Sequence, residues 1–388
     1  MRPRYDWLVV GAGLTGATIA GRIARERGER VLVVDARPHI GGNVFDGPDA
    51  HGVVVHRYGP HAFHTNSVRV WEHLSQFTDW HPYEHRVVAD LGPELVQGLA
   101  SGDGLIPVPF NLTALDACFG ADAPRLAARL AARFAGQEHV PVLRLLEDAD
   151  ADVRRVAAFV YEHVFLGYTV KQWGRRPEDL DASVTARVPV RLSRDDRYFQ
   201  DRYQATPSGG FAEMVRRMLD HACIEVRTGC SAADLGAADR ARRTVYTGPL
   251  DGYFGHALGV LPYRSLRFEW AHHRVGGGGL AQPVAQINRP SAPSVTRSTE
   301  YRHMTGQAHA GTTVSWETPE AYVPGANEPF YPVPHADARA LFDRYAALAA
   351  TDAPDVVFAG RLADYRYYNM DQAVARALTV FDRQIAPL

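Results

Sequence analysis

Residues 6–35 read DWLVVGAGLTGATIAGRIARERGERVLVVD. The apolar runs at the two ends of this stretch, over 6–10 and 31–35, predict buried strands, and 16–26 between them predict an amphipathic helix. A strand, a glycine turn, a helix and a second strand in this order form a βαβ unit, in which the two strands lie parallel in one sheet. The stretch therefore predicts an α/β protein.

The glycines of the turn and the acid after the second strand indicate what this unit binds. Gly11 permits the tight turn, Gly13 lets a pyrophosphate approach the backbone, and Gly16 allows the helix to pack closely on the strand. The N-terminus of the helix offers free amides and a positive dipole end to phosphate. Asp35 ends the second strand, where a carboxylate accepts ribose hydroxyls. The unit is therefore predicted to bind a dinucleotide.

The residues around this unit favour FAD over NAD. Arg37 and the turn Gly41-Gly42-Asn43 are typical of flavoproteins of the glutathione-reductase and amine-oxidase type, in which this extension follows the pyrophosphate. A plain turn at these glycines is the alternative. Near the other end of the chain, a predicted strand over 356–359 leads through Gly360 into a helix that begins near Met370. The positive end of that helix would stabilise negative charge on reduced flavin, unless the segment is an ordinary strand–loop–helix closure.

Composition excludes several classes of protein. A chain of 388 residues exceeds what one hydrophobic core supports, so more than one domain is expected. A net charge of -2 gives no general attraction to nucleic acid or to an anionic membrane. The three cysteines form no CxxC pair, which argues against a disulfide framework or a zinc site. Because no apolar run is long enough to span a bilayer and the first strand runs directly into the glycine turn, we expect a cytoplasmic protein.

The pattern changes along the rest of the chain. Leu126, Leu130 and Phe134 recur every fourth residue within 112–172, which predicts an inserted helical domain. Residues 191–203 carry many charges and few apolar anchors, so they predict a surface loop that orders poorly unless something binds it. Further strands are expected over 53–55, 86–91, 224–227, 244–246 and 266–270, and a final helix over 372–378.

Arginine supplies almost all of the positive charge. Lys171, within YTVKQWG (168–174), is the only lysine among 42 basic residues. A bias in composition accounts for most of that imbalance, and it makes the retention of this one lysine suggestive.

Several further segments, in a fixed order along the chain, are similar to one family, the UDP-galactopyranose mutases. These flavoenzymes interconvert UDP-galactopyranose and UDP-galactofuranose. The segments are GPHAFHT (59–65), YEHR (83–86), PVPFNL (107–112), GYTVKQW (167–173), RVPVR (187–191), DRYF (196–199), YTGP (246–249), YRSLRFE (263–269), PFYPV (329–333) and residues 360–372.

The resemblance implies an α/β fold in which a Rossmann-like FAD-binding domain carries an inserted helical domain and an antiparallel β-sheet substrate domain. The FAD-binding domain would be discontinuous, taking 1–80 with about 205–265 and 352–388. The helical domain would take about 112–185 with an adjoining mobile loop over 186–203, and the sheet domain about 81–111 and 266–351.

The resemblance also implies a set of site residues. Trp173 resembles the tryptophan near the uracil, and Arg187 and Arg297 resemble the two arginines that hold the diphosphate, whose charge they would neutralise without a metal. These two arginines and His61 are the implied catalytic residues. Cofactor contacts are expected from Gly11, Gly13, Thr15, Gly16, Asp35, Arg37, Gly42, Asn43, His61, His64, Arg361, Met370 and Asp371. Substrate contacts are expected from Asn111, Tyr168, Thr169, Trp173, Arg187, Tyr198, Asn288, Arg297, Tyr331, Tyr367 and Asn369.

His61 and His64 have a spacing that metal ligands also show. No third ligand lies near them in the sequence, so a contact with the isoalloxazine is favoured and no metal is expected. Asn369 stands where many members of the family carry an acid, so an amide would have to hold the site without charge. The segment 286–297 is about one residue shorter than the family pattern, which blurs the alignment of Asn288.

The activity implied by the resemblance is an isomerisation that requires reduced FAD. The flavin N5 would attack the sugar C1 as UDP departs, and the sugar ring would open and close again in its other size, a step of galactofuranose biosynthesis for cell wall polysaccharide. No Ser/His/Asp or Cys/His constellation is evident, as expected where a cofactor supplies the nucleophile.

Two other functions stay open. An amine-oxidase-like or desaturase-like FAD oxidoreductase would share the glycine turn but leaves 168–173 and 187–191 without a role. A non-catalytic protein that binds a nucleotide sugar is the second alternative. The sequence does not fix the oligomeric state, and a homodimer or a larger homo-oligomer is compatible with it.

Overall fold

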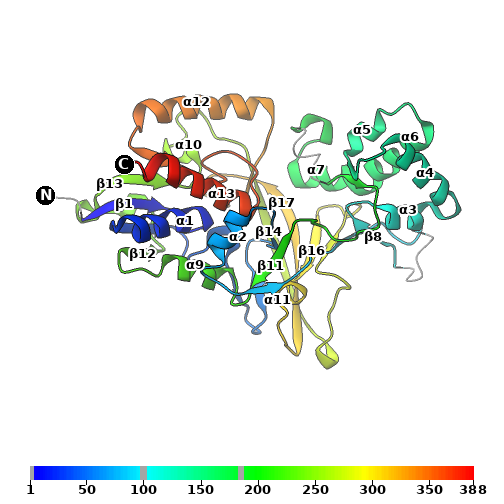
Figure 1. Ribbon diagram of the computed structural model, residues 1–388, viewed down its shortest axis with the longest axis horizontal. Helices are drawn as coiled ribbons and strands as arrows, with labels where there is room; N and C mark the ends of the chain where they lie inside the picture. Colours follow the sequence, from blue (N-terminus) through cyan, green and yellow to red (C-terminus); the bar gives the residue numbers. More distant parts are fainter. Residues whose placement is uncertain (1–3, 97–102, 182–187) are drawn as a thin grey trace. The chain divides into compact units, whose positions relative to one another are not determined.

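The computed structural model describes residues 4–96, 103–181 and 188–388. The chain divides into two compact units. Unit 1 comprises Met1–Tyr83, Asp201–Ser265 and Tyr322–Leu388, and unit 2 comprises Glu84–Gln200 and Leu266–Ala321. Figure 1 labels their helices and strands.

Unit 1 is built on a parallel sheet with the strand order β12-β2-β1-β13-β19. The strands are β1 (Tyr5–Val10), β2 (Val31–Asp35), β12 (Ile224–Thr228), β13 (Ala241–Tyr246) and β19 (Val356–Phe358). Helices cover a parallel sheet on both faces, so its central strands read as unbroken apolar runs. The four valine and leucine side chains of 31–34 are accordingly fully buried. The predicted α/β class and the βαβ unit are confirmed.

The helix of the βαβ unit organises the other helices of unit 1. α1 (Leu14–Arg22) continues as a π-helical segment over Ile23–Arg27 and ends at Gly28, whose φ of 66° is left-handed. α9 (Phe211–Leu219) and α13 (Met370–Val380) pack against α1 (Figure 1) and share its apolar core. The remaining helices are α2 (Val68–Leu74), α10 (Leu250–Tyr253) and α12 (Ala336–Asp352).

Short strands complete unit 1. β3 (Asp46–Pro48) pairs with β4 (Val54–His56), and β11 (Tyr203–Pro207) lies between β5 (Phe63–Thr65) and β6 (Trp80–Pro82). β18 (Tyr331–Pro332) pairs with the first residues of β14 (Tyr263–Arg274), a strand that begins in unit 1 and continues into unit 2.

Unit 2 contains a second sheet in which β14 is followed by β17-β16-β15-β7-β8. These strands are β7 (Val87–Asp90), β8 (Leu105–Val108), β15 (Gln286–Asn288), β16 (Arg297–Glu300) and β17 (Gly311–Ala321). β7–β8, β15–β16 and β16–β17 are antiparallel pairs, whereas β15 and β7 run parallel. The sheet thus has the expected antiparallel character with one parallel junction.

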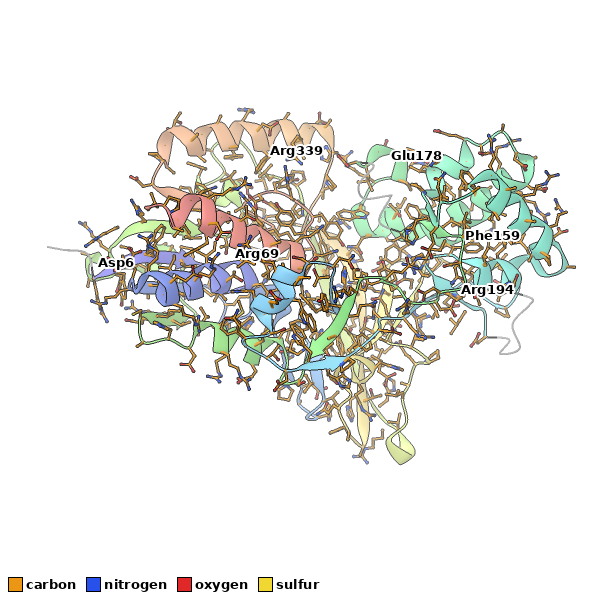
Figure 2. The ribbon with its side chains drawn as sticks, viewed as in Figure 1. Asp6, Arg69, Phe159, Glu178, Arg194 and Arg339 are labelled. Atoms are coloured by element: carbon orange, nitrogen blue, oxygen red, sulfur yellow. The ribbon has the colours of Figure 1, made fainter. Side chains whose placement is uncertain are left out.

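Most of the described helices of unit 2 follow one another in sequence. These are α3 (Leu112–Phe119), α4 (Ala123–Arg133), α5 (Val142–Leu146), α6 (Ala151–Val160) and α7 (Gly167–Trp173), with a π-helical segment over Tyr161–Leu166 before the last. α11 (Arg302–Thr305) lies apart from them in the sequence, between β16 and β17. The side chains of Leu126, Leu130 and Phe134 are buried, as their fourfold spacing predicted. Phe159 lies among these helices (Figure 2) with its ring centroid 5.1 Å from that of Phe119.

The charged segment after residue 190 differs from the loosely held loop that the sequence predicted. β10 (Val190–Arg191) pairs with β9 (His139–Val140), and Arg191 is buried. Its guanidinium donates hydrogen bonds to the carbonyl oxygens of Arg197 and Tyr198. Burial lowers the Arg191 pKa. The charges of this segment therefore hold its own backbone, a role that composition alone does not reveal.

Of all the described helices, none has the length and apolar character needed to cross a membrane.

Substituting Gly16 tests the packing of α1 on β1. A Cβ at Gly16 would lie 1.9 Å from the Gly11 carbonyl oxygen and 3.2 Å from a Val9 methyl carbon. Because a backbone carbonyl cannot yield without moving the strand, Gly16→Ala should lower the free energy of unfolding by about 3 kcal/mol. Gly236→Ala is the control, since its nearest neighbour would be 3.9 Å away, and it should cost less than about 1 kcal/mol. Equal unfolding midpoints in urea for the two variants would contradict this packing.

Candidate functional site

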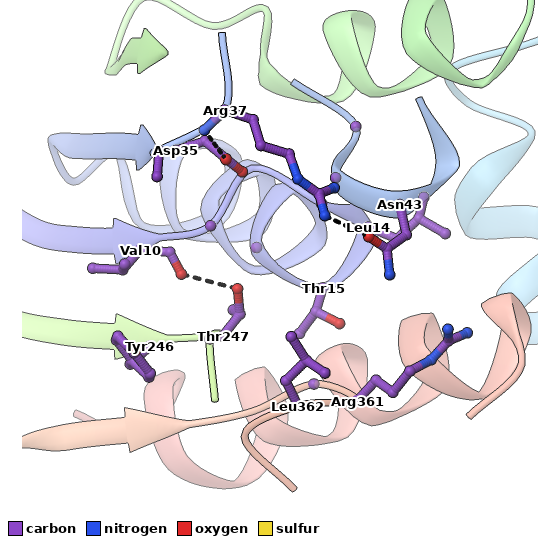
Figure 3. Close-up of a pocket in the computed structure, with 18 of the residues that line it drawn as sticks. Val10, Leu14, Thr15, Asp35, Arg37, Asn43, Tyr246, Thr247, Arg361 and Leu362 are labelled. Atoms are coloured by element: carbon purple, nitrogen blue, oxygen red, sulfur yellow. Dashed lines mark hydrogen bonds between the residues drawn. The ribbon is translucent and has the colours of Figure 1, made fainter. Parts of the chain in front are cut away.

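A cavity of about 420 Å³ lies in unit 1 around the carboxyl ends of β1 and β2. In parallel α/β sheets, ligands bind at this edge, and the volume is in the range of small-molecule sites. Figure 3 shows side chains that line it. All the predicted cofactor residues line the cavity except His64 and Asp371. Ser231, Thr247 and Leu362 also line it, and the sequence did not predict them.

One end of the cavity is the glycine turn before α1. Gly11 has a φ of 105°, and a Cβ there would lie 2.0 Å from the Thr247 hydroxyl oxygen. Gly13 precedes α1 as its N-cap, and within the described residues no side chain caps this helix and no acid lies in its first turn. The first amides of α1 are therefore available to an anion, and the helix dipole favours one there.

Asp35 is held next to this turn by the backbone. One carboxylate oxygen accepts a hydrogen bond from the amide of Ala12 at 2.8 Å, and the other accepts one from the amide of Arg37 at 2.9 Å (Figure 3). Each carboxylate oxygen can accept a second hydrogen bond. This geometry allows Asp35 to bind a diol such as the hydroxyls of a ribose.

Arg37 is fixed by three neighbours in unit 1. Its guanidinium donates to the Asn43 side-chain oxygen at 2.9 Å (Figure 3), lies 4.0 Å from the centre of the Tyr58 ring and pairs with Glu328. Tyr58 and Glu328 come from distant parts of the sequence and carried no signal there. They hold the Arg37 charge at the rim of the cavity.

The histidine motif is positioned by a buried histidine. His61 lines the cavity, and its amide donates to the Nδ1 of His56 at 3.0 Å. His56 is fully buried, and burial lowers its pKa to about 4 although Asp46 opposes the shift. A neutral His56 therefore holds the His61 backbone, with the ring proton on Nε2 because Nδ1 accepts.

His64 and Asp371 lie beside the cavity rather than in its lining. His64 pairs with Asp201 at 2.8 Å, and Thr65 next to it donates to Asp371 at 3.0 Å. The second of these contacts joins β5 to α13. Among residues 4–96, 103–181 and 188–388, no group of three or more His, Cys, Asp or Glu side chains could hold a metal ion.

The N-terminus of α13 also borders the cavity. Met370 is its first residue and lines the cavity, while Asn369 is its N-cap within a capping box with Gln372. The Asn369 amide donates to the Gln372 side chain at 2.9 Å. Asn caps a helix as well as Asp does, so the uncharged residue keeps this helix terminus intact. The positive end of the α13 dipole is then the feature that favours negative charge in the cavity.

A cluster of aromatic rings surrounds Arg361. Its guanidinium donates to the Tyr368 carbonyl oxygen at 2.6 Å and lies 5.5 Å from the centre of the Tyr331 ring. Tyr331 and Tyr367 meet edge to face with their centroids 5.3 Å apart. Tyr331, Arg361 and Tyr367 are thus brought together within unit 1 although 36 positions separate the first from the last.

In unit 2 the predicted Arg297 and Asn288 face each other. They are partners in the register of the antiparallel pair β15–β16. The Asn288 side chain accepts a hydrogen bond from Gln286 at 2.9 Å, and the Arg297 guanidinium lies 2.8 Å from a carboxylate oxygen of Glu317 on β17. The Glu317 side chain is fully buried, whereas that of Arg297 is 16% exposed. A buried carboxylate therefore orients an arginine whose other side reaches the surface.

The other predicted substrate residues of unit 2 differ in their settings. Tyr168 is half-buried on α7, and Thr169 and Trp173 are buried on the same helix. The backbone amide of Tyr198 donates to the His85 carbonyl oxygen, and its ring packs on the core of the helices. Arg187 lies outside the described residues.

Asn111 has a structural role that the sequence did not predict. It is 1% exposed, its side-chain oxygen caps α3 by accepting from the amide of Ala114, and its side-chain nitrogen donates to Asp195 and Asp196. Both the oxygen and the nitrogen of the side-chain amide are engaged in these hydrogen bonds, so the structure supports a role for Asn111 as a helix cap rather than as a ligand contact.

Comparisons with known proteins identify the family. Residues 163–367 match the family model described as UDP-galactopyranose mutase, and residues 9–77 match that of an NAD(P)-binding Rossmann-like domain. A probable UDP-galactopyranose mutase of Klebsiella pneumoniae is 33% identical over 379 residues, 97% of this chain and 93% of the relative. The chain belongs to the UDP-galactopyranose mutase family.

Other relatives and solved structures agree with membership in this family. The UDP-galactopyranose mutase of Mycoplasma pneumoniae is 33% identical over 97% of this chain and 95% of its own length, and a dTDP-fucopyranose mutase of Escherichia coli is 29% identical over 96% of each. A crystal structure of reduced UDP-galactopyranose mutase matches with a TM-score of 0.72 at 14% identity, covering 100% of this chain and 95% of that one. A putrescine oxidase variant matches with a TM-score of 0.56 at 14% identity, covering 99% of both chains, and shares the fold alone.

Within this mutase-family chain, sequence patterns missed the supporting residues. Glu317, His56 and Glu328 each hold a predicted site residue, yet each lies in an unremarkable stretch of sequence. The only signal was the acidic Glu317 in an otherwise apolar and small-residue strand, GTTVSWE. Such a buried acid indicates a charged partner, but it does not say which one.

The pKa of His56 predicts a dependence of stability on pH. In the unfolded chain an ordinary histidine binds a proton below pH 6.5, whereas folded His56 stays neutral down to about pH 4. The folded state should therefore lose up to about 3 kcal/mol as the pH falls from 6.5 to 4, with no contribution above that window. His56→Asn keeps an acceptor for the His61 amide but does not titrate.

Urea unfolding between pH 4 and pH 8 measures this effect. The half-buried His73, whose pKa is also lowered to about 4, contributes equally to both proteins and so cancels in the difference. The wild-type protein should lose more stability than His56→Asn on acidification, and parallel pH profiles would show that folding does not lower the pKa of His56.

Proposed function

We propose that this chain is a flavoenzyme that interconverts UDP-galactopyranose and UDP-galactofuranose and works only when its FAD is reduced. The observation that carries the proposal is the similarity to UDP-galactopyranose mutases over 97% of the chain. The ring contraction involves no net oxidation, so an isomerase rather than an oxidoreductase is proposed. We further propose that the enzyme acts in the cytoplasm.

The cavity of unit 1 fits FAD. The uncapped N-terminus of α1 would bind the pyrophosphate, Asp35 the ribose, and the N-terminus of α13 would lie near the flavin. Bound reduced FAD would supply the nucleophile of the reaction. The positive dipole end of α13 would lie near the flavin. The hydrogen bond from the His61 amide to His56 would hold the backbone at His61 in place beside the flavin.

Residues of unit 2 would bind the UDP portion. Arg297 would pair with the diphosphate and stabilise the charge that builds up as it leaves the sugar, and Glu317 would keep the guanidinium oriented before substrate arrives. Arg187 would add a second guanidinium, and Trp173 and Tyr168 would contact the uracil. In unit 1, Tyr331 and Tyr367 beside Arg361 would contact phosphate or sugar oxygens. Two arginines suffice to neutralise a diphosphate, so this arrangement needs no metal.

One experiment tests the function as a whole. The purified protein should be yellow, and after reduction with dithionite it should convert UDP-galactofuranose to UDP-galactopyranose, as followed by chromatography. The oxidised protein should be inactive. A dTDP-fucopyranose substrate should be run in parallel, because one relative is named for that sugar nucleotide. A colourless protein that FAD cannot reconstitute, or consumption of oxygen with an amine substrate, would contradict the proposal.

Arg297→Ala tests the diphosphate contact. Loss of a group that stabilises charge in the transition state should reduce kcat by about 100-fold or more, while the flavin spectrum stays unchanged. Arg297→Lys should recover only part of the activity because an ammonium cannot make two parallel hydrogen bonds. The control is Arg267→Ala, since Arg267 lies in the same sheet and pairs at the surface with Glu269 and Glu320. Equal turnover of the two alanine variants would remove Arg297 from the site.

A further inference from the structure

The only lysine of the chain binds three backbone carbonyl groups at once. The Nζ of Lys171 on α7 donates to the carbonyl oxygens of Arg289 at 2.6 Å, Pro290 at 3.0 Å and Ala292 at 2.6 Å. An ammonium has three protons in a tetrahedral arrangement, so this set of acceptors matches its donors. The planar guanidinium that the chain uses everywhere else presents its donors in one plane.

The three carbonyl groups belong to the loop between β15 and β16. This loop joins Asn288 to Arg297, the two predicted substrate residues that pair across the hairpin. The other partner, α7, carries Tyr168, Thr169 and Trp173. One ammonium therefore ties the helix with three predicted substrate residues to the loop whose two ends carry two more.

A second contact shows that the helix and the loop approach closely. A Cβ on Gly167, the first residue of α7, would lie 2.5 Å from the Pro290 carbonyl oxygen. The helix thus meets the loop at both of its ends, through a glycine at the start and through Lys171 in its last turn. Lys171 is half-buried, and burial lowers its pKa to about 8. Burial of a charged group carries a cost, so a side chain retained there must offset it through these contacts.

We propose that Lys171 is a positioning residue for UDP: it clamps α7 to the β15–β16 loop and so holds the residues on both elements in one arrangement. This inference rests on the proposed function of the chain. Without the clamp the helix and the loop keep their separate structures but lose their mutual placement. UDP must then order them when it binds, which lowers its affinity.

Lys171→Met removes the donors and keeps an unbranched side chain. UDP affinity, measured by isothermal titration calorimetry on the FAD-containing protein, should fall by about 10-fold, which corresponds to about 1.4 kcal/mol. Lys171→Arg should recover part of the affinity. Val170→Ala is the matched control, since Val170 is an exposed neighbour on α7, and its affinity should equal that of the wild type. Flavin content should be the same in all four proteins.

A double substitution separates positioning from a general loss of stability. If Lys171 acts by placing Trp173 and the loop, Lys171→Met should have little left to remove once Trp173 is gone. The double variant with Trp173→Ala should then weaken UDP binding clearly less than the product of the two single effects. A full product, or a Lys171→Met protein that binds UDP like the wild type, would overturn the inference. Absence of UDP binding by the wild type itself would instead contradict the proposed function.

Discussion

The close approach of Gly16 to the Gly11 carbonyl is the constraint on which unit 1 depends. With no room for a Cβ between them, α1 packs directly on β1, and its first amides are left at the edge of the sheet where the cavity lies. α9 and α13 then pack on α1, so the N-terminus of α13 reaches the same cavity from a segment more than 350 residues later. One backbone contact thereby fixes two helix termini around a single ligand site.

A different principle organises unit 2, where buried charges orient the exposed ones. Glu317 holds Arg297, Arg191 holds the backbone of the charged segment after it, and Lys171 holds the loop beside Arg297. Glu317 and Arg191 are buried and Lys171 is half-buried, and each meets several acceptors or an opposite charge, as its desolvation requires. Glu317, Arg191 and Lys171 are not candidate UDP contacts. They nevertheless determine where the candidate UDP-binding side chains of this unit lie.

Sequence patterns predicted the elements wherever local periodicity is strong. The βαβ unit, the helical segment after residue 112 and the strands at 224–228 and 356–358 all lie where expected. They did not reveal α12, whose alanines are spread along the helix and give little contrast between its faces, nor α9 between the sheet strands. Among the predicted site residues, the glycine turn, Asp35 and Met370 line one cavity, and the sequence could single them out because a turn and a helix terminus are local features. The role of Asn111 as the cap of α3 could not be predicted in this way, since whether an asparagine caps a helix or contacts a ligand depends on its neighbours in space.

The sequence by itself determined the βαβ unit, the dinucleotide site at its glycine turn and, through the order of its motifs, membership in the mutase family. These features depend on steric limits and hydrogen-bonding groups within a few residues of one another. Only the tertiary structure decided that Glu317 serves Arg297, that His56 serves His61 and that Lys171 joins α7 to the β15–β16 loop. Each of these pairs is joined by folding alone. Each pair offsets the cost of removing polar groups from water, and no local pattern of residues records which groups folding will bury together.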